Sequence, residues 1–259
     1  MLALGLAAIV GSSACHRPGG HGSDEADAGS LDPDALVAEA EELRLAYEKG
    51  ASERAILKYQ DARDAWMRDS DGARAAKASQ MLGAAHEQLG FLDEALRGYL
   101  EAAELCRDSC DSLLESSIRS DIGLIQATLA DSGEFLAAAL EQCQRALSLS
   151  SPAGGLREVA QALTCAGEVE YNRGNLEKAL ALYRQAKRAW ERAADPRGLA
   201  ETLFYEETVR SDLSQFAEAK ANLEDARSLW TSVGGERGGP WVSSRWAGSS
   251  IVRASIKMP

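Results

Sequence analysis

Apolar residues recur at steps of three and four positions along most of this chain, which is the spacing of a helix with one buried face. The clearest case is the segment that follows Gly174. Gly174 is expected to end the preceding helix, because glycine tolerates the left-handed backbone conformation in which many helices end. Asn175 comes next and can cap a new helix; the apolar positions of that helix are Leu176, Ala179, Leu180, Tyr183, Ala186 and Trp190. The stretch therefore predicts a helical hairpin that turns at Gly174.

The same spacing predicts five hairpins within residues 33–232, joined by loops of helix-breaking residues such as 151–155 and 195–198. Alanine, leucine, glutamate and arginine dominate, and runs of β-branched residues are nearly absent, which favours an all-α fold. The predicted helix pairs are 33–48 with 51–68, 73–89 with 92–107, 113–132 with 135–149, 156–173 with 176–193, and 199–213 with 216–232.

Each predicted second helix carries one signature: an alanine, a larger residue four positions later, and an alanine three positions beyond that. The five instances are Ala55, Tyr59 and Ala62; Ala95, Tyr99 and Ala102; Ala139, Cys143 and Ala146; Ala179, Tyr183 and Ala186; and Ala219, Leu223 and Ala226. The leading alanines are 40, 44, 40 and 40 residues apart. Self-similarity at such a period is typical of stacked helical hairpins.

With the glycines Gly83, Gly90, Gly167 and Gly174, this signature resembles the tetratricopeptide (TPR) repeat over roughly residues 33–232. The resemblance is strong in the second and fourth repeats, and the period is similar to that of TPR variants with longer helices. It implies a right-handed α-solenoid of about five hairpins. In the fifth repeat, Glu206 and Glu207 stand where the family prefers Leu-Gly, so we expect its first helix to pack loosely.

The resemblance also implies that the first helices line a concave groove in which peptides bind. The candidate groove residues are first-helix residues not used for packing: Arg44, Tyr47, Gln80, Glu87, Gln88, Glu168, Tyr171, Asn172, Thr208 and Asp212. Tyr171, beside the amide of Asn172, could stack on an extended segment. The alternative is that Tyr171 packs against the next repeat. No cluster of lysine and arginine for clamping a C-terminal carboxylate is visible.

Charge narrows the choice of partner. The formal net charge of the 259-residue chain is −12 at pH 7, whereas nucleic-acid binding needs lysine and arginine to neutralise phosphate. A surface that binds anionic lipid is equally disfavoured. A basic or amphipathic protein partner suits the chain better, although acidity also serves solubility alone.

Residues 1–14 are apolar and small, and we interpret them as a secretory signal that ends before Cys15. Ser13, Ala14 and Cys15 resemble the bacterial lipobox, which implies a lipid-anchored cysteine. Ser12 departs from the leucine that the lipobox prefers, and no lysine or arginine precedes the apolar run. Cleavage by an ordinary signal peptidase and an uncleaved anchor are the alternatives. We expect 15–32 to be a disordered linker.

Residues 233–259 are rich in glycine and serine, and no acidic residue follows Glu236. Three hypotheses are open for this segment: a truncated or frameshifted end of a longer array, a genuine disordered tail, or a basic segment that binds a partner.

The sequence holds no motif of a serine hydrolase elbow, a phosphate loop, a zinc protease or a paired Cys-x-x-Cys, so we predict no enzyme activity, no cofactor and no metal site. His86 is expected to be a packed or surface residue. Cys143 is expected to be buried as a small apolar side chain. Cys106 and Cys110 are poorly spaced for a disulfide within a regular helix, but a frayed helix end could permit one.

The sequence thus predicts an exported, membrane-tethered scaffold of the bacterial cell envelope, which binds a partner peptide or helix in the concave groove. The alternative is a truncated TPR sensing or regulatory arm of a larger multidomain protein.

Overall fold

The computed structural model describes residues 32–46, 50–131 and 133–233, and all regular secondary structure in these ranges is α-helical. The predicted signal, Cys15, nearly all of the predicted linker, Tyr47 and residues 234–259 lie outside the described residues. The helices are α1 (Pro33–Ala46), α2 (Ala51–Arg68), α3 (Gly72–Gln88), α4 (Leu92–Cys106), α5 (Ser112–Leu129), α6 (Gly133–Ala153), α7 (Leu156–Asn172), α8 (Leu176–Arg192), α9 (Pro196–Asp212) and α10 (Phe216–Ser232).

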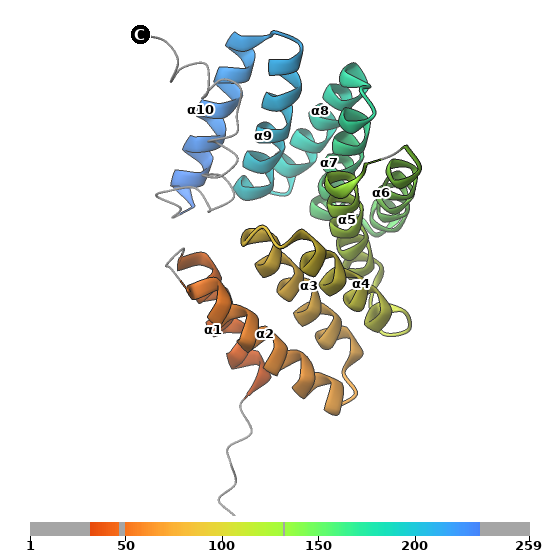
Figure 1. Ribbon diagram of the computed structural model, residues 1–259, viewed down its shortest axis with the longest axis vertical. Coiled ribbons are helices and arrows are strands. Elements are labelled where there is room, and N and C mark those ends of the chain that lie inside the picture. The colour runs from red at the N-terminus through yellow and green to blue at the C-terminus, as the bar shows by residue number, and fades with distance from the viewer. Residues whose placement is uncertain (1–31, 47–49, 132, 234–259) are drawn as a thin grey trace, which may run out of the picture. The chain divides into compact units, whose positions relative to one another are not determined.

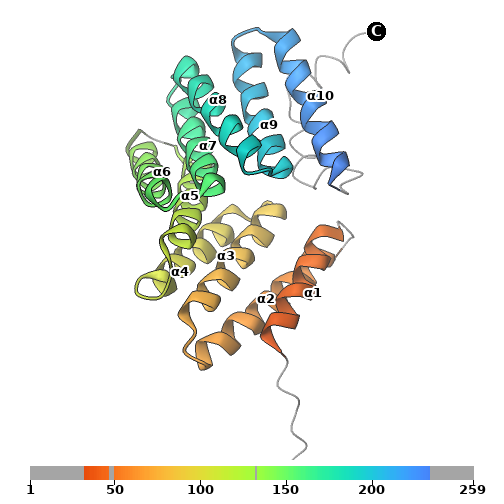
Figure 2. The same cartoon turned by 180° about the vertical axis from the view of Figure 1, so that it is seen from behind.

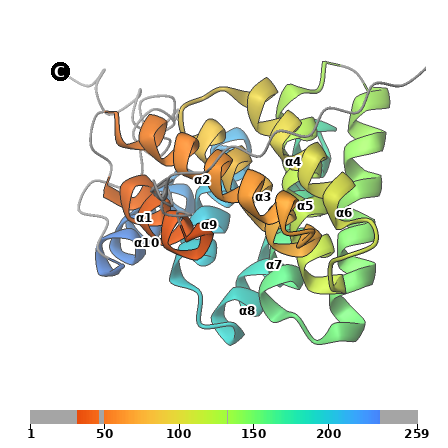
Figure 3. The same cartoon turned by 90° about the horizontal axis from the view of Figure 1, so that it is seen from below.

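The ten described helices pair in chain order, as Figures 1 and 2 show from opposite sides. Each odd-numbered helix packs against the even-numbered helix that follows it, and each hairpin packs against the next. First helices also contact one another directly, α5 with α7 and α7 with α9. Figure 3 shows α5 and α6 of the third hairpin side by side. This arrangement confirms the predicted all-α class.

The turn within the fourth hairpin forms at Gly174, which has φ of +80°. Its N–H donates to the Tyr171 carbonyl at 2.8 Å and the next N–H donates to the Glu170 carbonyl at 2.9 Å, so carbonyls at the end of α7 are satisfied. The predicted cap at Asn175 is wrong in its detail. Asn175 occupies the N-cap position of α8, but its side chain donates to Glu170 Oε2 at 2.7 Å because that carboxylate is buried and needs donors.

In two hairpins a tyrosine ring of the second helix covers a glycine of the first. A Cβ atom on Gly83 would lie 2.7 Å from the Tyr99 ring, and one on Gly167 would lie 2.4 Å from the Tyr183 ring. Only glycine therefore admits these rings. The alanines and the larger residues of the repeated signature are all buried.

The third hairpin fills the tyrosine position differently. Cys143 on α6 is buried, as expected, and its sulfur is bonded to Cys165 on α7, a link that the sequence did not predict. A Cβ atom on Gly123 would lie within 3 Å of both sulfurs. The disulfide thus takes the place of the ring and joins two successive hairpins.

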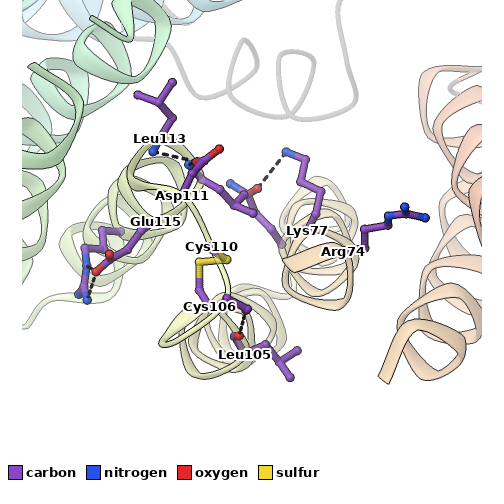
Figure 4. The surroundings of a disulfide bond; sticks show 12 residues. Arg74, Lys77, Leu105, Cys106, Cys110, Asp111, Leu113 and Glu115 are labelled. Carbon is purple, nitrogen blue, oxygen red and sulfur yellow. Dashed lines mark hydrogen bonds and ion pairs between the residues drawn. A yellow bond between two sulfur atoms is a disulfide. The ribbon is translucent and has the colours of Figure 1, made fainter. Parts of the chain in front are cut away.

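A second disulfide joins Cys106 and Cys110 (Figure 4). Helix α4 ends at Cys106, and Cys110 lies beyond a turn, with 4.9 Å between the two Cα atoms. The disulfide thus forms where the regular helix ends, which relieves the poor spacing of the two cysteines within a helix. Figure 4 also shows Asp111, which caps α5 by accepting from the Leu113 and Leu114 N–H groups.

Two predicted loops are partly helical. Residues 196–198 form the first turn of α9, because Asp195 accepts from the Arg197 and Gly198 N–H groups at 3.1 Å and proline suits the first helical position. Helix α6 continues through Pro152 to Ala153. The φ of proline fits a helix, and in the last turn only one N–H is lost.

The expectation that α9 packs loosely is also wrong. Glu206 and Glu207 are both almost fully buried. Glu206 accepts from Lys187 at 2.8 Å and pairs with Arg210 at 2.6 Å, and Glu207 accepts from Ser211 at 3.0 Å. Burial opposes their effect, but Lys187 and Arg210 hold the pKa of Glu206 below its usual value. The partners explain why a helix with two buried carboxylates packs closely.

Candidate functional site

A cavity of about 700 Å³ lies along the first helices of the hairpins. Residues of α1, α3, α5, α7 and α9 contribute most of its wall, with a few from α4 and α8. Its volume falls within the range of ligand-binding sites, and both polar and apolar side chains contribute to its wall.

A hydrogen-bonded network crosses the wall from α3 to α7. Asp121 on α5 accepts from Gln80 Nε2 at 2.6 Å on one oxygen and from Gln161 Nε2 at 2.5 Å on the other. Ser117 accepts from Gln80 at 2.8 Å and donates to Gln161 Oε1 at 3.1 Å. Lys77 donates to Gln80 Oε1 at 3.0 Å. The network fixes the Asp121 carboxylate between two amides of neighbouring hairpins.

The Asp121 position recurs along the array. Gln80, Asp121, Gln161 and Glu201 follow one another at steps of 41, 40 and 40 residues, on α3, α5, α7 and α9, and all four line the cavity. They occupy the same place in four successive first helices. We call this row of side chains the polar ladder.

The two carboxylates of the polar ladder are electrostatically unusual. Burial raises the pKa of Asp121 to about 7, and the nearby Glu87 carboxylate adds to the effect while the hydrogen bond from Gln80 opposes it. Burial also raises the pKa of Glu201 to about 8, with further contributions from Glu87, Asp195 and Asp121. Negative charge is therefore costly in this part of the cavity.

Two of the three cations that line the cavity, Arg44 and Arg157, are paired with other carboxylates. Arg44 forms an ion pair with Glu41 at 2.8 Å, and Arg157 forms one with Asp195 at 3.1 Å. Within the described parts of the chain, neither Asp121 nor Glu201 has an ion-pair partner.

Four of the candidate groove residues line the cavity: Arg44, Gln80, Glu87 and Gln88. Glu87 accepts from the buried Tyr99 hydroxyl at 2.8 Å, in the same way that Glu41 accepts from Tyr59 at 2.5 Å. The carboxylates of Glu87 and Glu41 thus also satisfy the hydroxyls of tyrosines that are buried on the second helices.

The remaining described candidates lie outside the cavity wall: Glu168, Tyr171, Asn172, Thr208 and Asp212. Glu168 is buried and accepts from Tyr183 at 3.1 Å. The Tyr171 hydroxyl donates to Asp212 on α9 at 2.9 Å, and its ring packs against a cluster that includes residues of α9. Asn172 donates to the Ala127 carbonyl on α5 at 3.1 Å. Tyr171, Asn172 and Asp212 thus join neighbouring repeats, whereas Glu168 bonds within its own hairpin and Thr208 within its own helix.

The sequence reasoning missed Asp121, Gln161 and Glu201. The signal that could have found them is the period itself, because a polar residue recurs about 40 positions apart on four predicted first helices. His86, expected to be a packed or surface residue, is partly buried, with its ring centre 6.5 Å from that of Phe91. Burial lowers the pKa of its imidazole.

The described side chains form no group of three or more histidine, cysteine, aspartate or glutamate residues that could hold a metal ion. None of the helices in the described ranges combines the length and apolar character needed to cross a membrane.

No protein-family model matches the sequence, and no curated protein matches it. Several solved structures share its fold at low identity. The Rap conjugation gene regulator of the plasmid pLS20, solved in complex with the Phr* peptide, is 18% identical with a TM-score of 0.63, covering 77% of this chain and 53% of that one. Aspartyl phosphate phosphatase F from Bacillus subtilis is 12% identical with a TM-score of 0.55, covering 78% and 50%.

A kinesin light chain from Podosopora anserina, with nearly identical TPR-like repeats, is 12% identical with a TM-score of 0.52, covering 78% of this chain and 97% of that one. The chain spans about half the length of the first two proteins. Together with the ten described helices, these similarities show that the chain folds as an all-α, TPR-like solenoid.

Proposed function

We propose that this chain is a protein-interaction scaffold that binds a peptide or helix of a partner protein in the cavity along its first helices. The observation that carries the proposal is the cavity itself, because five successive hairpins contribute to one continuous wall. A partner segment of several residues could contact α1, α3, α5, α7 and α9 together. The similar Rap regulator was solved with a peptide, which supports the same use of the fold here.

A cavity-blocking variant tests this proposal. Random-sequence peptides are displayed and selected on the immobilised chain, and the affinities of synthetic copies are measured. Ala84 lines the cavity, so Ala84→Trp places a large ring in it. Ala221 lies exposed on α10, so Ala221→Trp is the matched control.

We expect Ala84→Trp to weaken binding at least about tenfold, a change of roughly 1.4 kcal/mol, while Ala221→Trp binds like the original chain. Equal binding by the two variants, with both folded by circular dichroism, would place the peptide site elsewhere.

We further propose that the scaffold is exported and tethered in the cell envelope through Cys15, facing the periplasm or the surface. The N-terminal sequence motivates this proposal, and the two disulfides support it because disulfides persist in oxidising compartments. Metabolic labelling with palmitate tests it: the original chain should take up label and Cys15→Ala should not. Absence of label from both would rule out the anchor. The role of a regulatory arm of a larger protein stays a prediction.

A further inference from the structure

We propose that the cavity recognises a partner segment through a basic side chain, an arginine or a lysine, whose cation pairs with Asp121 and Glu201 of the polar ladder. This inference rests on the proposed peptide-binding function and names the chemistry that the bound segment must carry.

Two hydrogen bonds hold the Asp121 carboxylate on the cavity wall. The Gln80 and Gln161 amides each donate to one of its oxygens, at 2.6 and 2.5 Å. Each carboxylate oxygen has a second acceptor position. The amides thus hold the group in one orientation on the cavity wall and leave it able to accept further donors.

Charge complementarity supports the same inference. The charged side chains that line the cavity are Glu41 and Arg44 on α1, Lys77 and Glu87 on α3, Asp121 on α5, Arg157 on α7 and Glu201 on α9. Asp195, at the start of α9, lies outside the wall but pairs with Arg157. Arg44 and Arg157 are committed to Glu41 and Asp195, and Lys77 donates to Gln80. Among the described residues, Asp121 and Glu201 therefore have no ion-pair partner within 4 Å, although the charge of Lys77 acts on Asp121 from farther away.

A bound cation would also change the free energy of ionising Asp121 and Glu201. Their raised pKa values show that ionisation of Asp121 and Glu201 is unfavourable in the unliganded cavity. A cation placed between them reverses the balance, because it favours the ionised form of both. An arginine side chain suits this role best, since its five donors can serve more than one acceptor.

The cavity also offers apolar surface on which the methylene stem of an arginine side chain could pack. Leu124 on α5 and Tyr205 on α9 line it beside the polar ladder. The methylene stem of a long basic side chain packs on such apolar surface while its head reaches the carboxylates.

The experiment uses peptides selected by the display procedure above, on the full chain. Each selected arginine is replaced by citrulline, a neutral analogue of the same shape, and affinities are measured for both forms. The protein variants are Asp121→Asn and Glu201→Gln, which remove a charge at nearly constant volume. The control is Glu218→Gln, exposed on α10.

We expect selected peptides to be rich in arginine or lysine, and citrulline at one position to weaken binding about tenfold or more, as for the loss of a charged hydrogen bond. Asp121→Asn or Glu201→Gln should reduce this difference between arginine and citrulline, and Glu218→Gln should not. Affinity for the arginine form should rise between about pH 6 and pH 9 as the two carboxylates ionise. The citrulline form should show a smaller rise.

Peptides that lose binding in Ala84→Trp but bind equally with arginine or citrulline would overturn the cation inference and leave the scaffold proposal standing. Peptides that ignore Ala84→Trp would overturn both. Because the citrulline exchange alters only the ligand, its result holds even if a protein variant folds poorly.

Discussion

At the scale of single residues, the contact between a glycine and a tyrosine sets how closely the two helices of a hairpin approach. The Tyr99 and Tyr183 rings lie over Gly83 and Gly167, and their hydroxyls donate to Glu87 and Glu168. Each ring is therefore held at both its face and its polar end, which explains how so large a side chain is buried without an unsatisfied hydroxyl.

Replacing Gly167 by alanine tests this contact. The added Cβ would lie 2.4 Å from the Tyr183 ring, so the helices must separate, and we expect a loss of about 1–3 kcal/mol of unfolding free energy. Gly133→Ala is the control, because its Cβ position at the start of α6 has no atom within 4 Å apart from its chain neighbours and the backbone of its own helix turn. That change should be neutral or favourable by up to about 1 kcal/mol. Equal midpoints of urea unfolding for both variants would contradict the close contact.

Glu201 gives the chain a pH dependence of the opposite sign to that of a salt-bridged carboxylate. Its pKa in the folded chain is about 8, above the ordinary value of about 4.3 in an unfolded chain. The folded state therefore holds a proton that the unfolded state has lost, and stability falls as pH rises from about 5 to 8. Asp121, with a pKa of about 7, acts in the same direction.

We accordingly expect Glu201→Gln to be more stable than the original chain at pH 8.5, with a smaller stability difference between pH 5.5 and pH 8.5. Urea unfolding at the two pH values measures both quantities. Glu218→Gln on the exposed face of α10 is the control and should keep the original slope. A Glu201→Gln variant with an unchanged slope would show that Glu201 titrates normally in the folded chain.

At the scale of helices, caps and covalent links decide where elements end and how they join. Asp195 starts α9 at Pro196 by accepting two backbone N–H groups, although Asp195 to Gly198 is typical of a loop in the sequence. Cys143 and Cys165 join α6 to α7, in place of the aromatic ring found in the neighbouring hairpins. Neither feature follows from helical periodicity, since both depend on how a few side chains meet.

Removal of the Cys143–Cys165 disulfide should destabilise the array more than removal of the Cys106–Cys110 disulfide. The first closes a loop with a sequence separation of 22 and the second one of 4. In the chain-entropy model these losses are about 3 and about 2 kcal/mol. The paired variants Cys143→Ala/Cys165→Ala and Cys106→Ala/Cys110→Ala are compared by urea unfolding without reductant. The opposite ranking, or reactive thiols at these positions in oxidised, denatured protein, would contradict this expectation.

At the scale of the whole array, the sequence pattern predicts the helices and their order better than it predicts which side chains of different hairpins lie together. The spacing of apolar residues predicted the ten described helices and most of their ends. The repeat period and the resemblance to the TPR predicted the solenoid. They did not predict which first-helix residues share a wall. Tyr171 and Asn172 have the composition of a binding surface, but they join repeats, whereas Asp121 and Gln161 line the cavity. The difference lies in how successive hairpins pack against one another, which the spacing within a single helix does not encode.

The polar ladder also couples repeats that are not neighbours in the chain. In a simple solenoid each repeat interacts only with those beside it. Here the two neighbours of the third hairpin share one of its side chains, because Gln80 of the second hairpin and Gln161 of the fourth both donate to Asp121. Substituting either glutamine changes the environment of the carboxylate that the other one binds. We therefore expect Gln80→Ala and Gln161→Ala to be non-additive in unfolding free energy, by about 0.5 kcal/mol or more.

The comparison needs a pair of residues that share no hydrogen-bond partner. Gln80→Ala with Lys187→Met serves, because Lys187 bonds to Glu206 between α8 and α9, away from Asp121. That pair should add within about 0.3–0.5 kcal/mol. Chemical unfolding of the single and double variants gives both coupling energies. If the two pairs were equally additive, the hydrogen bonds to Asp121 would be independent, and the polar ladder would be a row of separate contacts. A larger coupling for the glutamine pair would show that three hairpins share one carboxylate, so that a ligand bound at Asp121 also changes the stability of the repeats on either side.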